Sequence, residues 1–195
     1  MSNPTQFEIV PGSIADTAMQ HGGELPKPPI MVVMMDISYS MNEMDARLHG
    51  RTVTRYEAAK AQLIELQARH PGQIAIIAFG DEALACPGGV PPIPDGWTQL
   101  HLALEMAREA DTGQMKFLII SDGLPQRQET VQIEAEKFTV PIDVIFVGKD
   151  SNGERFMQDF AAKTGGTFYT DTSTMLLTTT ITLLLTMDSA GPIVT

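Results

Sequence analysis

A short polar segment directly follows an apolar run near the middle of the first third of the chain. Residues 30–35 are apolar throughout, and Asp36, Ser38 and Ser40 then stand at alternate positions. A continuous apolar run of this length is typical of a buried strand. If the chain turns tightly where that strand ends, the carboxylate and the two hydroxyls can be directed at one point. Hard oxygen ligands gathered in this way favour Mg²⁺ or Mn²⁺ over zinc.

Two later segments carry oxygen side chains of the same kind. Thr98 stands just before a helical pattern, and Asp122 follows an apolar run that ends at residue 121. In open α/β sheets, ligands bind beyond the carboxyl ends of the strands. If the strands that precede Asp36 and Asp122 are neighbours, both carboxylates therefore reach one crevice. The alternative is that Asp36 and the serines cap a helix, and that Asp122 begins an ordinary turn.

These three elements together resemble the metal-ion-dependent adhesion site (MIDAS) of von Willebrand factor A (vWA) domains. The pattern of that family is Asp-x-Ser-x-Ser, then a Thr, then an Asp commonly followed by Gly, and both the order and the approximate spacing match. The resemblance implies that Ser38, Ser40 and Thr98 offer hydroxyls to a Mg²⁺ or Mn²⁺ ion. It implies that Asp36 and Asp122 bind the ion directly or through water.

The sequence departs from the family pattern at two places and adds a segment. Tyr39 and Trp97 stand where the family often has Gly, so both side chains crowd or extend the rim of the site. Trp97 either faces a partner or packs under its own loop, because tryptophan is amphipathic enough for both. Residues 42–54 form a polar insertion beside the site, interpreted as a solvated loop, with a specificity loop as the alternative. Its basic side chains are Arg47, His49 and Arg51.

The rest of the chain alternates apolar runs with helical patterns, which predicts an α/β fold with a doubly wound, mostly parallel central sheet and helices on both faces. One short antiparallel edge strand is expected at 82–86, and another edge strand at 7–10. The other expected strands are 30–35, 73–79, 116–121, 140–148 and 167–170, and the expected helices are 55–68, 100–110, 129–138 and 154–163. The resemblance implies a last helix at 174–187. Residues 1–29 are interpreted as an N-terminal extension and residues 30–190 as the vWA domain.

The net charge, the apolar segments and the cysteine count bear on which partners the protein binds and on where it is located. The charge is −11, from 24 acidic and 13 basic residues, and the basic residues are not clustered, so a nucleic-acid footprint is missing. The apolar run 175–187 is shorter than the ~20 residues that a membrane-spanning helix requires and contains several threonines. The first 29 residues do not have a signal-peptide pattern, and Cys86 is the single cysteine, so we expect a cytoplasmic location.

The leading functional hypothesis is a non-enzymatic, Mg²⁺-dependent protein-binding domain whose partner donates an Asp or Glu to the ion. Cytoplasmic bacterial members of the family often serve AAA+ ATPases as adaptors or scaffolds, which the resemblance carries over as an expectation. The alternatives are a Mg²⁺-dependent hydrolase or phosphotransferase, and a structural subunit in which the ion only stiffens the loops. The phosphate-binding and nucleophile-elbow motifs of known hydrolases are missing, and the segment after Asp36 has no second Asp. His101 is expected on a helix surface, and the alternative is that it lies near Thr98 and supports the ligands of the ion.

Overall fold

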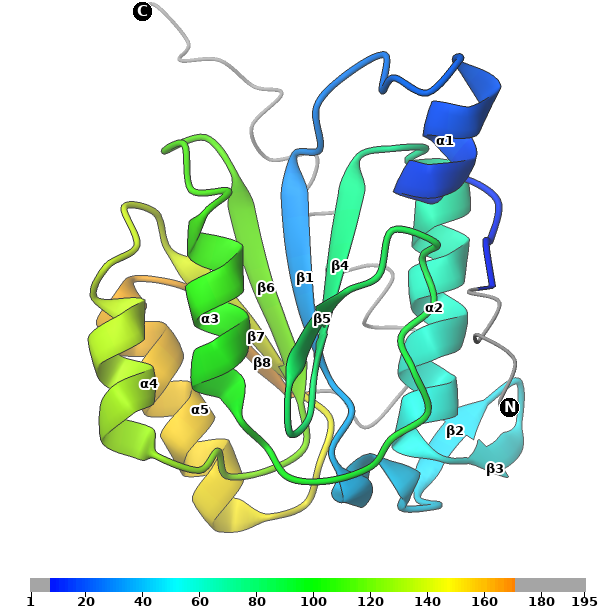
Figure 1. The fold of residues 1–195 in the computed structure, drawn as a ribbon. Helices are drawn as coiled ribbons and strands as arrows, with labels where there is room; N and C mark the ends of the chain where they lie inside the picture. The colour runs from blue at the N-terminus through cyan, green and yellow to red at the C-terminus, as the bar shows by residue number, and fades with distance from the viewer. Residues whose placement is uncertain (1–7, 171–195) are drawn as a thin grey trace, which may run out of the picture.

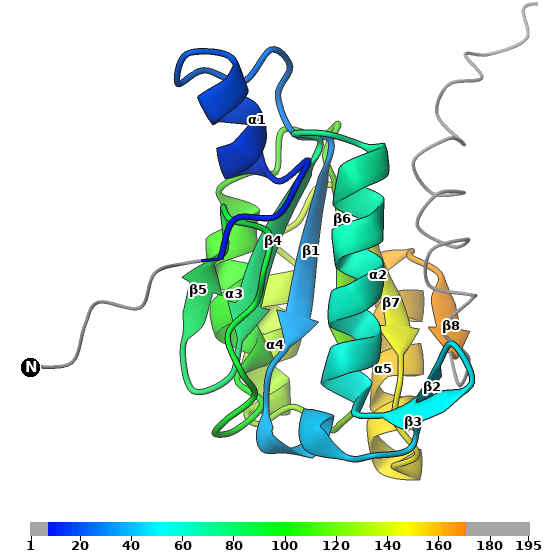
Figure 2. The same ribbon diagram turned by 90° about the vertical axis from the view of Figure 1, so that its right-hand side faces the viewer.

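The computed structural model describes residues 8–170. Its centre is a six-stranded sheet with the strand order β5-β4-β1-β6-β7-β8, and helices lie on both of its faces (Figure 1, Figure 2). Every pair of neighbouring strands is parallel except β4 and β5, which are antiparallel. The predicted fold class, including its one short antiparallel edge strand, is therefore confirmed.

The elements have the following bounds. The strands of the main sheet are β1 (Met31–Asp36), β4 (Ile74–Phe79), β5 (Ala83–Ala85), β6 (Lys116–Ser121), β7 (Ile142–Phe146) and β8 (Phe168–Thr170). The α-helices are α1 (Ile14–Gln20), α2 (Arg55–Arg69), α3 (Leu100–Arg108), α4 (Gln128–Ala135) and α5 (Ser151–Thr164). A 3₁₀ helix, η1 (Tyr39–Asn42), and a separate hairpin of β2 (Ala46–Leu48) and β3 (Arg51–Val53) lie between β1 and α2.

Strand β1 lies at the centre of the sheet and is buried on both faces. The side chains of Met31, Val33 and Met35 belong to the core beneath α2, whereas Val32 and Met34 belong to the core beneath α3, α4 and α5. This alternation follows from the two-residue period of a strand, and it explains why the run is apolar at every position. Figure 2 shows α2 on one side of β1 and α3 on the other.

Strand β4, which follows β1 in the main sheet, pairs with one edge of β1, and β6, which comes later in the chain, pairs with the opposite edge of β1. Such a reversal of strand order opens a crevice at the carboxyl ends of the two strands. The helices that follow them lie on opposite faces, with α2 after β1 and α4 after β6. The fold therefore places the ends of β1 and β6, with Asp36 and Asp122, side by side.

Three regions differ from the sequence-based expectations or lie outside the structure described. Residues 8–10 are not in a strand: the amide of Val10 donates to the carbonyl of Gly88, but the carbonyl of Val10 accepts from the nearby amide of Ser13, so an edge strand there is wrong. The N-terminal extension contains α1, whose start is capped by the hydroxyl of Ser13, which accepts from the amide of Asp16. The polar insertion forms the β2–β3 hairpin rather than an open loop. The helix expected at 174–187 lies outside the described residues.

No helix within residues 8–170 combines the length and the apolar character that crossing a lipid bilayer requires.

Candidate metal centre

The two predicted carboxylates, Asp36 and Asp122, lie together at the carboxyl ends of the two central strands. Asp36 is the last residue of β1, and Asp122 comes directly after β6, the parallel neighbour of β1. Both side chains are almost fully buried. They are close enough for the negative charge of Asp122 to raise the pKa of Asp36. The structure therefore brings together two residues that lie far apart in the sequence.

Asp36 accepts hydrogen bonds from uncharged donors at both of its oxygens. The backbone N–H of Ser38 donates to Oδ1 over 2.7 Å, and the hydroxyl of Ser121 donates to Oδ2 over 2.6 Å. Burial raises the pKa of Asp36 to about 7, and the charge of Asp122 acts in the same direction, whereas these hydrogen bonds partly counteract both effects. A cation placed here would relieve the cost of burying this carboxylate.

The two serines connect this carboxylate loop to Asp122. The hydroxyls of Ser38 and Ser40 are 3.1 Å apart, and Ser40 donates to Oδ1 of Asp122 over 2.7 Å. Ser38 is the N-cap residue of η1, yet its side chain makes no capping bond. The helix-capping alternative therefore fails for Ser38, because its hydroxyl is directed at Ser40 instead.

Thr98 lies in the loop that precedes α3, and this loop is fastened to both neighbouring loops. The backbone N–H of Gln126, four residues after Asp122, donates to the carbonyl of Thr98 over 3.0 Å. The backbone N–H of Tyr39 donates to the carbonyl of Gly96 over 3.1 Å. Thr98 itself is 9% exposed. These backbone hydrogen bonds bring the loop of Thr98 to the end of the sheet where the other two motif segments lie.

The chemistry of these side chains fits a hard divalent cation. Two carboxylates can balance its charge, and hydroxyls supply neutral oxygen ligands. Among the described residues, no cluster of three or more His, Cys, Asp or Glu side chains is arranged to hold a metal ion. An ion at this place would therefore depend on Ser38, Ser40 and Thr98 as much as on the two carboxylates.

A buried arginine that the sequence analysis missed contacts the site. Arg55 is the first residue of α2, and its side chain is 9% exposed. Its Nη1 donates to Oδ2 of Asp122 over 2.7 Å. Its Nε and Nη2 donate to the two oxygens of Asp45 over 2.9 and 2.8 Å. The guanidinium group therefore lies between two carboxylates and joins the site to the insertion.

The sequence contained a signal for where Arg55 lies but none for what it contacts. Thr54 and Glu57 form a capping box, in which the hydroxyl of Thr54 accepts from the amide of Glu57 and the carboxylate of Glu57 accepts from the amide of Thr54. A Thr-x-x-Glu pattern in the sequence therefore predicts that a helix begins at Arg55. Its contact with Asp122, 67 residues later, follows only from the packing of α2 against the end of the sheet.

Asp45 ties the insertion to the body of the molecule. The hydrogen bonds from Arg55 lower the pKa of Asp45, and Lys149 lies 3.2 Å from the same carboxylate. Asp45 directly precedes β2, so the base of the hairpin is held by these two cations. Arg47 and Arg51 are exposed on the hairpin. The insertion is therefore an ordered, solvent-exposed element beside the site.

The rim of the site carries exposed apolar side chains. Among the described residues, ten large hydrophobic side chains are exposed, and five of them lie on η1 and the loops at this end of the sheet. Trp97 is 67% exposed, so it does not pack under its own loop. His101, expected on a helix surface, is instead buried, and its Nδ1 has no hydrogen-bond partner within residues 8–170. We call the five exposed side chains the apolar rim: Tyr39, Met44, Ile93, Trp97 and Leu124.

Comparisons with known proteins rest on structure alone, since no protein-family profile and no curated protein matches the sequence. The conserved hypothetical protein BatB from Bacteroides thetaiotaomicron superimposes with a TM-score of 0.64 and 18% identity, over 82% of this chain and 98% of BatB. The vWA domain of SpRpn10 superimposes with a TM-score of 0.52 and 16% identity, over 80% of this chain and 94% of that domain. The chain has a vWA fold.

A third structure with this vWA fold is a mutant of the PilB minor pilin from Streptococcus sanguinis. It superimposes with a TM-score of 0.62 and 14% identity, over 87% of this chain and 65% of the pilin chain. At these identities the likeness extends to the arrangement of the strands and helices. The metal ligands and the partners of this chain are therefore argued from its own residues.

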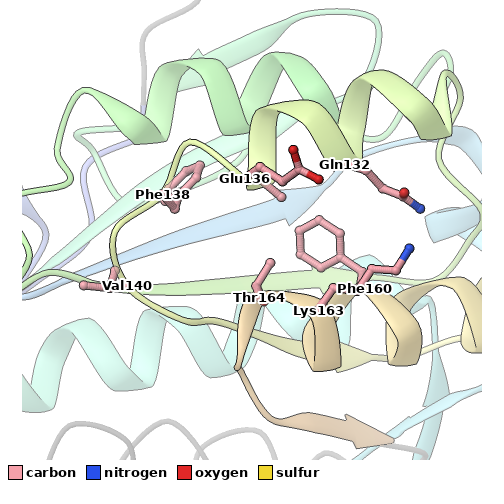
Figure 3. A pocket seen from close by; sticks show the side chains of 8 residues that line it. Gln132, Glu136, Phe138, Val140, Phe160, Lys163 and Thr164 are labelled. Carbon is pink, nitrogen blue, oxygen red and sulfur yellow. The ribbon is translucent and has the colours of Figure 1, made fainter.

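A hollow of about 450 Å³ lies between the last turns of α4 and α5, away from the candidate metal centre (Figure 3). Its lining is mixed, with the apolar side chains of Phe138, Val140 and Phe160 beside the charged side chains of Glu136 and Lys163. Helices α4 and α5 begin near the carboxyl ends of the strands and end at the opposite edge of the sheet. The hollow therefore shares no lining residue with the candidate metal centre.

Proposed function

We propose that this chain is a metal-dependent protein-binding module. In this proposal Asp36, Ser38, Ser40, Thr98 and Asp122 hold one Mg²⁺ or Mn²⁺ ion, and a partner protein donates an Asp or Glu to it. The observation that carries the proposal is the hydrogen-bonded series from Ser38 through Ser40 to Asp122, which gathers the oxygens of two motif segments at the end of β1 and β6.

An open coordination position is the chemical requirement of this function. Mg²⁺ prefers six ligands and commonly retains exchangeable waters, so five side chains that act partly through water leave a position for the partner. The partner's carboxylate would replace a water and meet a cation in a partly dry site. That attraction offsets the repulsion between an acidic partner and a chain with a formal charge of −11.

The apolar rim supports binding of a protein rather than of a small anion. Tyr39 and Trp97 are adjacent to motif residues and present large surfaces to solvent. Aromatic side chains of this kind supply much of the binding energy where interfaces bury them. A partner segment that carries an acidic residue flanked by apolar residues would cover both the ion and the rim.

The same geometry gives little support to an enzyme. Ser38 and Ser40 are hydrogen-bonded to each other, and Ser40 also donates to Asp122. Within residues 8–170, neither hydroxyl is hydrogen-bonded to a histidine or lysine that would activate it as a nucleophile. His101 is buried away from solvent. We therefore propose a non-enzymatic role. The resemblance to the vWA family supports an adaptor or scaffold in an intracellular complex, such as one with an AAA+ ATPase.

A selection from a random peptide library tests the function without a known partner. Displayed peptides are bound to the immobilised chain in Mg²⁺ and eluted with EDTA. We expect the eluted peptides to share an Asp or Glu, and their binding to fall by tens to thousands of fold in Thr98→Ala, because losing a buried charged contact costs ~2–5 kcal/mol. Circular dichroism checks that this variant is folded.

The same experiment separates the alternatives. Peptides that stay bound through the EDTA step, are released only by denaturant, and bind Thr98→Ala as tightly as the wild type would place the interface elsewhere and leave the ion a structural role. Calorimetry with Mg²⁺ and Mn²⁺ on the wild type and Asp36→Ala measures the ion itself, and binding is expected to disappear in the variant. Turnover of a phosphoester that disappears in Asp36→Asn would instead favour the hydrolase.

A further inference from the structure

Arg55 occupies a position that a divalent ion would influence directly. Its guanidinium group donates to Oδ2 of Asp122 over 2.7 Å, while Ser40 donates to Oδ1 of the same carboxylate. Both oxygens of Asp122 are therefore engaged by groups of the chain itself, and one of those groups carries a full positive charge. By contrast, the donors to Asp36 are uncharged.

We propose that Arg55 is an internal cation that competes with the divalent ion for Asp122 and keeps the affinity of the site for that ion low. The proposal rests on the proposed function for the existence of the ion, and it adds a residue that sets the affinity of the site. Arg55 is a positioning residue in this proposal, since it acts on the ion through Asp122 and does not bind it.

Three features of Arg55 support competition. Its side chain is 9% exposed, so water screens its charge poorly. It shares Oδ2 of Asp122 with any ligand that approaches from that side. It is also held in place by two hydrogen bonds to Asp45, so it does not swing away freely when an ion arrives.

The charges of the connected network indicate the direction of the effect. Counted in their ionised forms, Asp36, Asp122 and Asp45 carry three negative charges and Arg55 and Lys149 carry two positive charges, so the network has a formal charge of −1. Without Arg55 the network has a formal charge of −2, which a divalent cation balances. Removing the charge of Arg55 should therefore strengthen ion binding, although it removes three hydrogen bonds from the protein.

The sign of this change separates competition from simple structural support. If Arg55 only held the loops in shape, its loss would loosen the site and weaken ion binding. If Arg55 competes, its loss strengthens ion binding while it destabilises the protein in the absence of metal. The two explanations therefore predict opposite changes in the dissociation constant of Mg²⁺.

The experiment measures Mg²⁺ and Mn²⁺ binding by calorimetry for the wild type, Arg55→Met, Arg55→Lys and Arg69→Met. We expect Arg55→Met to bind at least tenfold more tightly than the wild type. Arg55→Lys keeps the charge and should bind within a few fold of the wild type. Arg69→Met is the matched control, because it removes one exposed charge at the other end of the same helix.

Thermal unfolding in EDTA and in Mg²⁺ supplies a second measurement. Arg55→Met should unfold at a lower temperature than the wild type in EDTA and gain more from Mg²⁺ than the wild type gains. If Arg55→Met folds only with metal, it can be purified in Mn²⁺, and its affinity obtained by competition with a chelator of known dissociation constant.

Each outcome supports or overturns the inference. Equal or weaker binding by Arg55→Met, with binding retained in the wild type, would overturn the inference and leave the proposed function intact. Binding by Arg55→Met alone would support the inference and contradict ion binding by the native chain. Failure of every variant to bind either ion would overturn both proposals.

Discussion

Asp36 and Asp122 are two buried carboxylates at the ends of neighbouring strands, yet the protein treats their charges differently. Asp36 accepts from uncharged donors, namely the amide of Ser38 and the hydroxyls of Ser38 and Ser121, and burial raises its pKa to about 7. Asp122 accepts from a hydroxyl and from the guanidinium group of Arg55. One side of the site therefore has a built-in cation, and the other side does not.

The difference shows which half of the site depends on an external ion. A buried carboxylate without a cation is costly, and a metal ion would relieve this cost at Asp36. At Asp122 the charge of Arg55 already offsets the cost of burying the carboxylate, so a bound ion would stabilise Asp122 less than Asp36. The two carboxylates should therefore respond in opposite ways to substitution in the metal-free protein.

The largest expected effect is a difference in stability between Asp122→Asn and Asp36→Asn, and the contrast between the two carboxylates depends on it. In EDTA at pH 8, Asp122→Asn should lower the free energy of unfolding by roughly 3 kcal/mol, because it leaves the buried charge of Arg55 poorly compensated. Asp36→Asn should leave the stability equal or higher, since it removes an uncompensated charge and the hydroxyl of Ser121 can turn to accept from the new amide. Urea denaturation of the two variants measures both values. Equal losses in the two variants would contradict the contrast.

The pH dependence of stability sharpens the comparison on the Asp36 side. The pKa of Asp36 is raised from 3.8 to about 7 in the folded protein by burial and by the charge of Asp122. The folded state therefore holds the proton over this interval while the unfolded state releases it, so stability falls as the pH rises through it. In EDTA the wild type should lose on the order of 2 kcal/mol between pH 5 and pH 8 relative to Asp36→Asn, which cannot titrate there. Parallel stability curves for the two proteins would disprove this expectation.

The smallest expected effect concerns the loop that carries Thr98. Trp97 is the single tryptophan, is 67% exposed, and its amide donates to Asp81 over 2.9 Å. Addition of Mg²⁺ to metal-free protein should shift the emission of Trp97, because an ion bound by Thr98 would order the adjacent residue. Asp36→Asn, which lacks the carboxylate that benefits most from the ion, should give no shift. A constant emission in the wild type, with ion binding confirmed by calorimetry, would show that the indole does not sense the loop.

The local features of the fold were predictable because each has a local cause. The apolar runs predicted β1, β4 and β6 to within one residue at each end, and residues 55–68 matched α2 closely. The convergence of Asp36 with Asp122 was predictable because the strand ends of an α/β sheet meet at one edge. The short β5 was also predicted, and its antiparallel pairing with β4 confirms it as an edge strand.

The features that the sequence did not reveal depend on contacts between distant segments. The role of Arg55 depends on a guanidinium that reaches Asp122 across 67 residues, and an arginine at the start of a helix gives no sign of such a contact. The burial of His101 depends on how α3 packs against the sheet. The β2–β3 hairpin was missed because its strands are only three residues long and none of their residues is buried, so their pattern is not apolar.

The methionine-rich centre of the sheet has a consequence for oxidative damage. Met31, Met34 and Met35 of β1 are fully buried, so an oxidant cannot reach their sulfur atoms while the fold is closed. Met44 is 65% exposed, and it lies on the apolar rim next to Asp45. Peroxide should therefore convert Met44 to its sulfoxide long before it touches β1. Oxidation would thus make part of the rim polar while the core that holds Asp36 stays intact.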